Sequence, residues 1–98
     1  MELQLFSWDD AKNKSNQHKH GVSFEAARLV FDDPLHVTRQ DRLENGEKRW
    51  QTVGLAGGVV LLLVAHTWAE EESGAEHIRI VSARRATKLE RSVYEQGA

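Results

Sequence analysis

Three arginines lie in the stretch 79–86, where the sequence changes from a strand-like to a helix-like pattern. Arg79 begins an apolar run, and Arg84 and Arg85 open the segment that follows it. We predict a strand that runs directly into a helix here. The free N–H groups and partial positive charge of a helix N-terminus favour anions, and a guanidinium can bind a phosphate through two hydrogen bonds. The stretch therefore predicts a phosphate-binding site and points toward a nucleic-acid ligand.

The distribution of charge along the chain supports a local anion site. The formal net charge of −2 at pH 7 argues against a protein that coats nucleic acid without specificity. Residues 79–91 nevertheless contain five basic residues and one acid, whereas residues 70–76 contain four acids and no base. A basic patch of this kind can bind phosphate whatever the total charge is, and the mixed surface also suits a partner protein.

Length and composition narrow the class of protein. A chain of 98 residues has room for one domain, and its 40% hydrophobic and 29% charged content is ordinary for a folded protein. The absence of cysteine excludes disulfides, thiolate catalysis and cysteine-ligated zinc. The N-terminus lacks a secretory pattern, and the apolar run 55–65 is far shorter than the about 20 residues that span a membrane. We expect a cytoplasmic protein without cofactor, and no spacing of acids and histidines predicts a metal site.

The elements that must position the arginines can be predicted from hydrophobic periodicity and turn signals. A short strand at residues 3–8 should lead into a polar surface helix from Ala11 to about Lys19, which ends at Gly21. A second helix should run from Phe24 to about Phe31, with Ser23 as its N-cap.

The remainder of the chain is mostly strand-like. The segments 35–43 and 49–55 should form a hairpin around Asn45-Gly46, which is the strongest short hairpin signal. The segment 59–65 is apolar at every position, which predicts a central strand covered on both faces. A strand at 77–83 and a helix at 84–96 complete the order β-α-α-β-β-β-β-α. We therefore expect an α+β domain with a mostly antiparallel twisted sheet and helices packed on it.

Three stretches, read together, resemble a known family. They are Phe6-x-Trp8-Asp9-x-x-Lys12-Asn13-x-x-Asn16 with Lys19-His20-Gly21-Val22-Ser23-Phe24; Arg49-Trp50-x-x-Val53-Gly54; and Arg79-Ile80-Val81-Ser82-Ala83-Arg84-x-Ala86 with Glu90 and Tyr94. Together and in this order they resemble the BrnT family of type II toxins, over nearly the whole chain.

The resemblance implies a fold, an activity and a partner. It implies a single RelE-like ribonuclease domain over residues 1–98 and a metal-independent endoribonuclease that arrests growth by cutting RNA. It also implies neutralisation by a co-expressed BrnA antitoxin with a ribbon-helix-helix DNA-binding domain, in a hetero-oligomer that contacts operator DNA only through the antitoxin. Composition and spacing alone predict only a phosphate-binding α+β domain.

Metal-free RNA cleavage requires a base for the 2′-OH, an acid for the leaving 5′-oxygen and cations for the charge on phosphorus. We expect Arg79 and Arg84 to supply the cations by forking onto the scissile phosphate. His66 should end the central strand at the rim of the sheet, where a histidine can act as base or acid. Glu47, near the hairpin turn, is the alternative base. Arg49, Arg85, Lys88 and Arg91 should extend the RNA-binding surface.

Each of these assignments has a structural alternative. Arg79 could pair with an acid across the sheet, and Arg84 with Glu44 or Glu47. His66 could be a capped edge residue, and Glu47 a solvated turn carboxylate. The alternative for the whole chain is a non-catalytic binding module that holds a DNA-binding partner in a repressor complex. A nuclease needs a titratable base beside the arginines, and this requirement separates the two functions.

Overall fold

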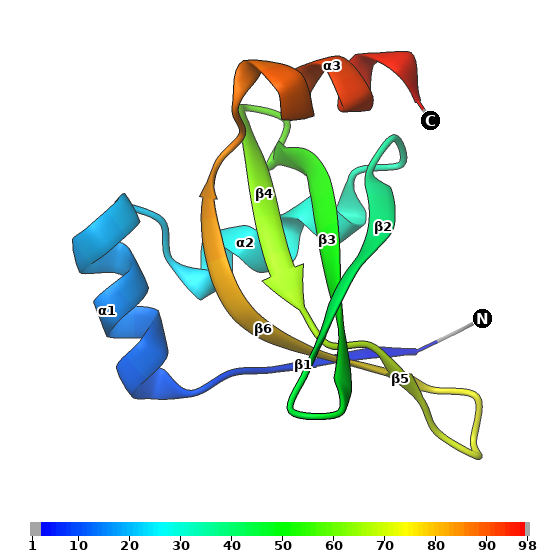
Figure 1. Cartoon of the computed structure of the whole chain (residues 1–98). Coiled ribbons are helices and arrows are strands. Elements are labelled where there is room, and N and C mark those ends of the chain that lie inside the picture. The colour runs from blue at the N-terminus through cyan, green and yellow to red at the C-terminus, as the bar shows by residue number, and fades with distance from the viewer. Residues whose placement is uncertain (1–2, 98) are drawn as a thin grey trace.

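A twisted six-stranded sheet forms the centre of the protein (Figure 1), whose computed structural model describes residues 3–97. The strands are β1 (Gln4–Ser7), β2 (Val37–Glu44), β3 (Glu47–Ala56), β4 (Val60–His66), β5 (Ala69–Glu70) and β6 (Glu76–Arg85). The helices are α1 (Asp10–His20), α2 (Phe24–Arg28), the 3₁₀ helix η1 (Leu29–Asp32) and α3 (Lys88–Gln96). The sheet has the order β1-β6-β4-β3-β2, with the two-residue β5 paired to β6. Only β1 and β6 pair in parallel within this described sheet, so the predicted α+β order and antiparallel character are confirmed.

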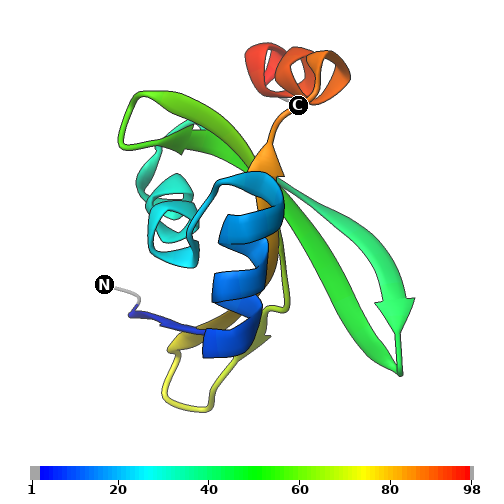
Figure 2. The same cartoon turned by 90° about the vertical axis from the view of Figure 1, so that its left-hand side faces the viewer.

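Helices cover the two faces of the sheet unequally (Figures 1 and 2). α1, α2 and η1 lie against one face, called here the α1–α2 face, and α3 lies at the end of the other, the α3 face. The main core fills the α1–α2 side and consists of Val22, Phe24, Ala27, Val30, Phe31, Ala56, Leu62, Val64, Ile78, Ile80 and Ala83. The α3 side has a smaller cluster of Val53, Leu61 and Leu63, against which Ala86 and Tyr94 pack. Much of the α3 face is therefore left to polar side chains.

The predicted central strand is confirmed in β4. Leu62 and Val64 belong to the core on one face, and Leu61 and Leu63 belong to the cluster on the other. Val59, expected at the start of this strand, instead lies in the preceding turn and is 85% exposed.

Local signals fix the boundaries of the first elements. The side chains of Asp9 and Ser23 accept hydrogen bonds from the first turns of α1 and α2, and Gly21 ends α1 in the left-handed conformation with a φ of 70°. Asn45 and Gly46 both have positive φ, 53° and 77°, as the tightest hairpin turn requires. The hydrogen bonds of these side chains and turns involve near neighbours, which is why the sequence predicts them.

α1 is polar on its surface but is fixed by a buried amide. Asn16 donates to the carbonyls of Val22 and Ala83, each at 2.8 Å, and accepts from the N–H of Ala83 at 3.1 Å. Its bonds to Ala83 satisfy backbone groups of β6 beyond Arg79, where β1 no longer pairs with that strand. It thereby anchors α1 against the strand that holds Arg79 and Arg84.

The prediction of a helix from residue 84 is wrong. Arg84 and Arg85 continue β6 and pair with Leu63 and Leu62, and α3 begins only at Lys88 after the N-cap Thr87. The cause is non-local, because the apolar residues of β4 offer a ladder of hydrogen bonds that β6 can follow to its last residue. Leu89 of α3 does not pack on the sheet and is 77% exposed. None of the helices in residues 3–97 is long and apolar enough to cross a membrane.

Candidate active site

Alternation along β6 places its arginines on the α3 face. Ile78, Ile80 and Ala83 lie in the core on the opposite side, so Arg79 and Arg84 face away from it. The three-residue step from Ile80 to Ala83 is possible because the register of β6 against β4 shifts between them. Both predicted phosphate ligands thus lie on one face, separated by about five residues of strand or roughly 16 Å.

Arg79 and Glu47 form the closest ion pair on this face. Nη2 of Arg79 donates to Oε1 of Glu47 at 2.8 Å, and each side chain is 48% exposed. The alternative in which Arg79 pairs with an acid across the sheet is therefore observed. The same contact joins the predicted cation to the alternative base, so a carboxylate lies beside a guanidinium on an accessible surface.

Arg49 lies beside this pair, but its guanidinium is poorly bonded. Its side chain is 15% exposed, with Nη2 3.9 Å from Glu47 and Nε 3.7 Å from Glu44. Within the described residues, its Nε and Nη1 atoms are buried and have no hydrogen-bond partner. A buried charged donor without an acceptor is costly, and such groups are common where a ligand supplies the missing acceptor. We call Glu47, Arg49 and Arg79 the guanidinium cluster.

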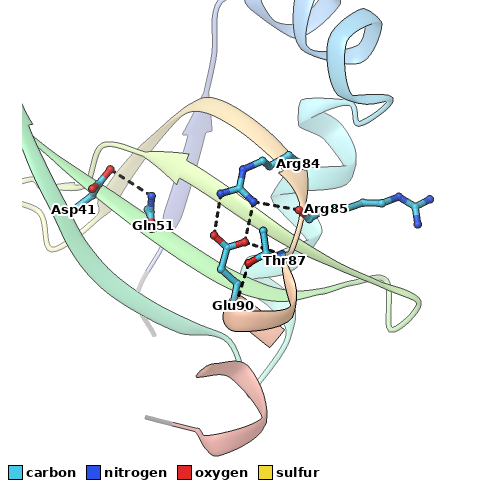
Figure 3. Close-up of polar contacts among 6 residues, drawn as sticks. All are labelled: Asp41, Gln51, Arg84, Arg85, Thr87 and Glu90. Atoms are coloured by element: carbon cyan, nitrogen blue, oxygen red, sulfur yellow. Dashed lines mark hydrogen bonds and ion pairs between the residues drawn. The ribbon is translucent and has the colours of Figure 1, made fainter. Parts of the chain in front are cut away.

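Arg84 is engaged differently from what we expected. Its Nη1 and Nη2 atoms donate to the two carboxylate oxygens of Glu90, each at 2.8 Å, and Nη1 also reaches the carbonyl of Arg85 (Figure 3). Glu90 also accepts from the N–H of Thr87, whose side chain accepts from Glu90 N, so this acid completes a capping box. The hydrogen bond from Arg84 lowers the pKa of Glu90, against the effect of burial, and the same bond raises the pKa of Arg84. Arg84 therefore ties α3 to β6, and neither Glu44 nor Glu47 is its partner.

The other predicted RNA contacts are dispersed. Arg85 points away from Arg84 and Glu90 (Figure 3) and lines a cleft on the α1–α2 side with Gln17 and Ser23. Lys88 and Arg91 are exposed on α3. Arg49 alone among the four predicted contacts belongs to the guanidinium cluster, so the basic residues of 79–91 do not form one continuous track.

His66 is not at the rim of the sheet. It is 1% exposed, on the α1–α2 face, with its ring 5.0 Å from that of Phe31. Nδ1 lies 2.9 Å from the carbonyl of Thr67 and Nε2 lies 2.7 Å from the hydroxyl of Thr52. Burial lowers the pKa of His66 to about 4, so the ring is neutral at pH 7. The prediction of its position is wrong because Thr52 and Phe31, which are distant in sequence, enclose the end of β4.

A cleft of about 380 Å³ adjoins Arg79 where β1 meets α1. Its lining includes Ser7, Asp9, Lys12 and Arg79. Lys12 was noted only as part of a sequence motif, and the structure adds it to the cationic groups near Arg79. The parallel pairing of Ser7 with Arg79 brings this cleft to the α3 face. The sequence does not predict the cleft, because a pairing between such distant residues has no local sequence signal.

His77, two residues before Arg79, also escaped the sequence analysis. Its Nε2 lies 2.9 Å from the hydroxyl of Ser7, and the side chain is exposed. The alternation that places Ile78 and Ile80 in the core was the signal that could have assigned His77 to the face of Arg79. Across residues 3–97 we find no group of three histidines or acids arranged to hold a metal ion.

Comparison with known proteins adds a family and a fold. The family model described as "Ribonuclease toxin, BrnT, of type II toxin-antitoxin system" matches residues 8–90. The crystal structure of the Brucella abortus ribonuclease toxin BrnT superposes with a TM-score of 0.58 at 18% identity, covering 88% of this chain and 99% of that one. At this identity the likeness shows a shared fold. No protein with a curated description matches the chain.

Proposed function

The chain belongs to the BrnT family of type II toxin-antitoxin ribonuclease toxins, and on that premise we propose that it is a metal-independent endoribonuclease whose active site is the guanidinium cluster. The unsatisfied guanidinium of Arg49 is the observation that favours this location. A phosphodiester would supply acceptors for Arg49 and Arg79 together, beside a carboxylate that can accept a proton.

The chemistry follows from the roles that these groups can take. Glu47 accepts the proton of the 2′-OH, and the 2′-oxygen attacks the adjacent phosphorus as the bond to the 5′-oxygen breaks. Arg79 and Arg49 stabilise the negative charge that develops on the phosphoryl oxygens. The products are a 2′,3′-cyclic phosphate and a 5′-hydroxyl end. Arg84, held by Glu90, positions α3 rather than binding the scissile phosphate.

Membership of a type II family implies an antitoxin partner. We propose that this partner is a BrnA-like protein with a ribbon-helix-helix domain, that it covers the α3 face in a hetero-oligomer, and that it alone contacts operator DNA. The polar, accessible ion pair of Glu47 and Arg79 suits a protein partner as well as RNA, since each side chain is 48% exposed. A protein that cuts RNA and is neutralised in this way would act in the cytoplasm.

Cleavage of a labelled RNA by purified, antitoxin-free protein in the presence of EDTA tests the proposal. Glu47→Gln, Arg49→Ala and Arg79→Ala should each lower the rate by roughly 10²–10³-fold, because each removes a base or a charge-stabilising donor. Arg28→Ala is the matched control, because Arg28 lies over the ring of Phe6 on the α1–α2 face. This variant should cleave the RNA at the wild-type rate. RNA that stays intact with the wild-type protein would favour the non-catalytic binding module instead, and equal rates for the wild type and all three variants would refute the guanidinium cluster as the active site.

A further inference from the structure

One histidine lies beside the guanidinium cluster. His77 and Arg79 are alternate residues of β6 and face the same side, and the hydroxyl of Ser7 fixes the ring through Nε2 at 2.9 Å. The other ring nitrogen, Nδ1, has no hydrogen-bond partner among residues 3–97 and is therefore available to a ligand. Alternate residues of a strand lie about 7 Å apart, so these two long side chains can reach the same phosphodiester linkage.

The remaining histidines do not lie beside the guanidinium cluster. His66 is buried on the opposite face, and Nδ1 of His36 is bonded to the carbonyl of Asp33 at 2.7 Å. His18 and His20 lie in the last turn of α1. Of the five histidines of the chain, His77 is thus the one that shares a face with Arg79 and Glu47.

We propose that His77 is the general acid of the cleavage reaction and donates a proton from Nδ1 to the leaving 5′-oxygen. The inference rests on the proposed ribonuclease function, and it fills the role that the guanidinium cluster leaves open. In the charged imidazolium, Nε2–H donates to the Ser7 hydroxyl, which holds the ring and leaves Nδ1–H as the proton donor. Ser7 is accordingly a positioning residue.

The step balances with the groups present. Glu47 takes the proton of the 2′-OH, the bond from the 2′-oxygen to phosphorus forms, and the bond to the 5′-oxygen breaks as His77 protonates it. Water and the product equilibria then restore the two protonation states. Histidine is the side chain whose ordinary charge change falls between about pH 5 and 8, so it can release a proton at neutral pH.

The surroundings of His77 come from five elements, its own strand included. Ser7 on β1 is its hydrogen-bond partner, and Ala69, its register neighbour on β5, carries no charge. The charged groups of the same face or the adjoining cleft are Arg79 on β6, Glu47 on β3, and Lys12 and Asp9 at the start of α1. The proposed base is thus bonded to Arg79, and the proposed acid lies two residues before Arg79 on the same strand face.

A pair of substrates distinguishes an acid from a structural residue. An RNA dinucleotide has a poor leaving group and needs the acid, whereas uridine 3′-(4-nitrophenyl phosphate) releases a stable phenolate and does not. His77→Ala should cleave the dinucleotide about 10²–10⁴-fold more slowly than the wild type and the activated substrate at nearly the wild-type rate. It should also lose the alkaline limb of the pH–rate profile. His18→Ala, which changes an exposed histidine of α1, should match the wild type on both substrates.

Two results would overturn the inference while leaving the ribonuclease function intact. One is normal cleavage of the dinucleotide by His77→Ala, and the other is an equal loss on both substrates, which would indicate a structural role. Ser7→Ala keeps the imidazole and should lower the rate on the dinucleotide only, which keeps the proposal testable if His77→Ala folds poorly. A wild-type protein that cleaves neither substrate would overturn the proposed function and this inference together.

Discussion

Acidification below about pH 6.5 should destabilise this protein through His66. Burial lowers the pKa of His66 to about 4, its contact with the Thr67 carbonyl acts in the opposite direction, and the charge of His36 lowers it further. In the unfolded chain the pKa of His66 returns to its ordinary value of 6.5. Between these two values the unfolded state binds more protons than the folded state, so the free energy of unfolding falls as the pH falls.

The magnitude follows from the separation of the two values. A fall in pKa from 6.5 to about 4 lowers the free energy of unfolding by about 3 kcal/mol once the pH is below both values. About 2 kcal/mol of this is lost by about pH 5. This is a large part of the roughly 5–15 kcal/mol that stabilises a typical domain. The contribution is fully present above pH 6.5 and is lost on the way down to about pH 4.

The assay is urea-induced unfolding, followed by tryptophan fluorescence at several pH values between about 7.5 and 5. His66→Gln should be less stable than the wild type near neutral pH but should show little dependence on pH in this window, because an amide does not titrate. His18→Gln should keep the wild-type slope, since His18 is exposed. Asp33 and Glu90 have lowered pKa values, so their contributions are lost only below their ordinary values of 3.8 and 4.5. Wild-type stability that is equal at both ends of the window, or a variant with the wild-type slope, would refute the reasoning.

Two further predictions concern packing and the anchoring of α3. Gly54→Ala should destabilise the protein by about 1–3 kcal/mol in urea titrations. A Cβ at this position would lie 2.9 Å from Val30 Cγ1 and 3.0 Å from His36 Cβ. Unchanged stability would show that η1 can shift to make room. Tyr94→Phe removes the 2.7 Å hydrogen bond to Asp33 and should lower the free energy of unfolding by about 1 kcal/mol. It should also speed amide hydrogen exchange in α3 more than in β4. Equal effects on both elements would contradict a local anchor.

The sequence predicts what near neighbours determine. The Asn45-Gly46 turn, the end of α1 at Gly21, the cap at Ser23 and the apolar run of β4 all depend on residues within one element or turn, and each is confirmed. The α+β order follows from these signals, and the family assignment follows from the three motifs and is confirmed by the match over residues 8–90.

Errors arose where distant residues decide the outcome. β6 continues through Arg84 because Leu63 of β4 pairs with it, and Arg84 then meets Glu90 instead of an open helix N-terminus. His66 is enclosed by Thr52 and Phe31, neither of which is near it in sequence. A pairing of Arg79 with an acid across the sheet was one alternative, but only the structure identifies that acid as Glu47 and shows Arg49 beside the pair.

The parallel pairing of β1 with β6 has a consequence for when activity can arise during synthesis. The hydrogen bond between Ser7 and His77 joins residues 70 positions apart, and β1 has no other strand neighbour within the described sheet. Closing so long a loop costs chain entropy, so this contact should form late in folding, after the β2–β3–β4 meander. A nascent chain lacks the opposite wall of the cleft until β6 has left the ribosome. The proposed active site is therefore assembled from both ends of the chain, and a product truncated before β6 would lack His77 and Arg79 and could not form a functional nuclease.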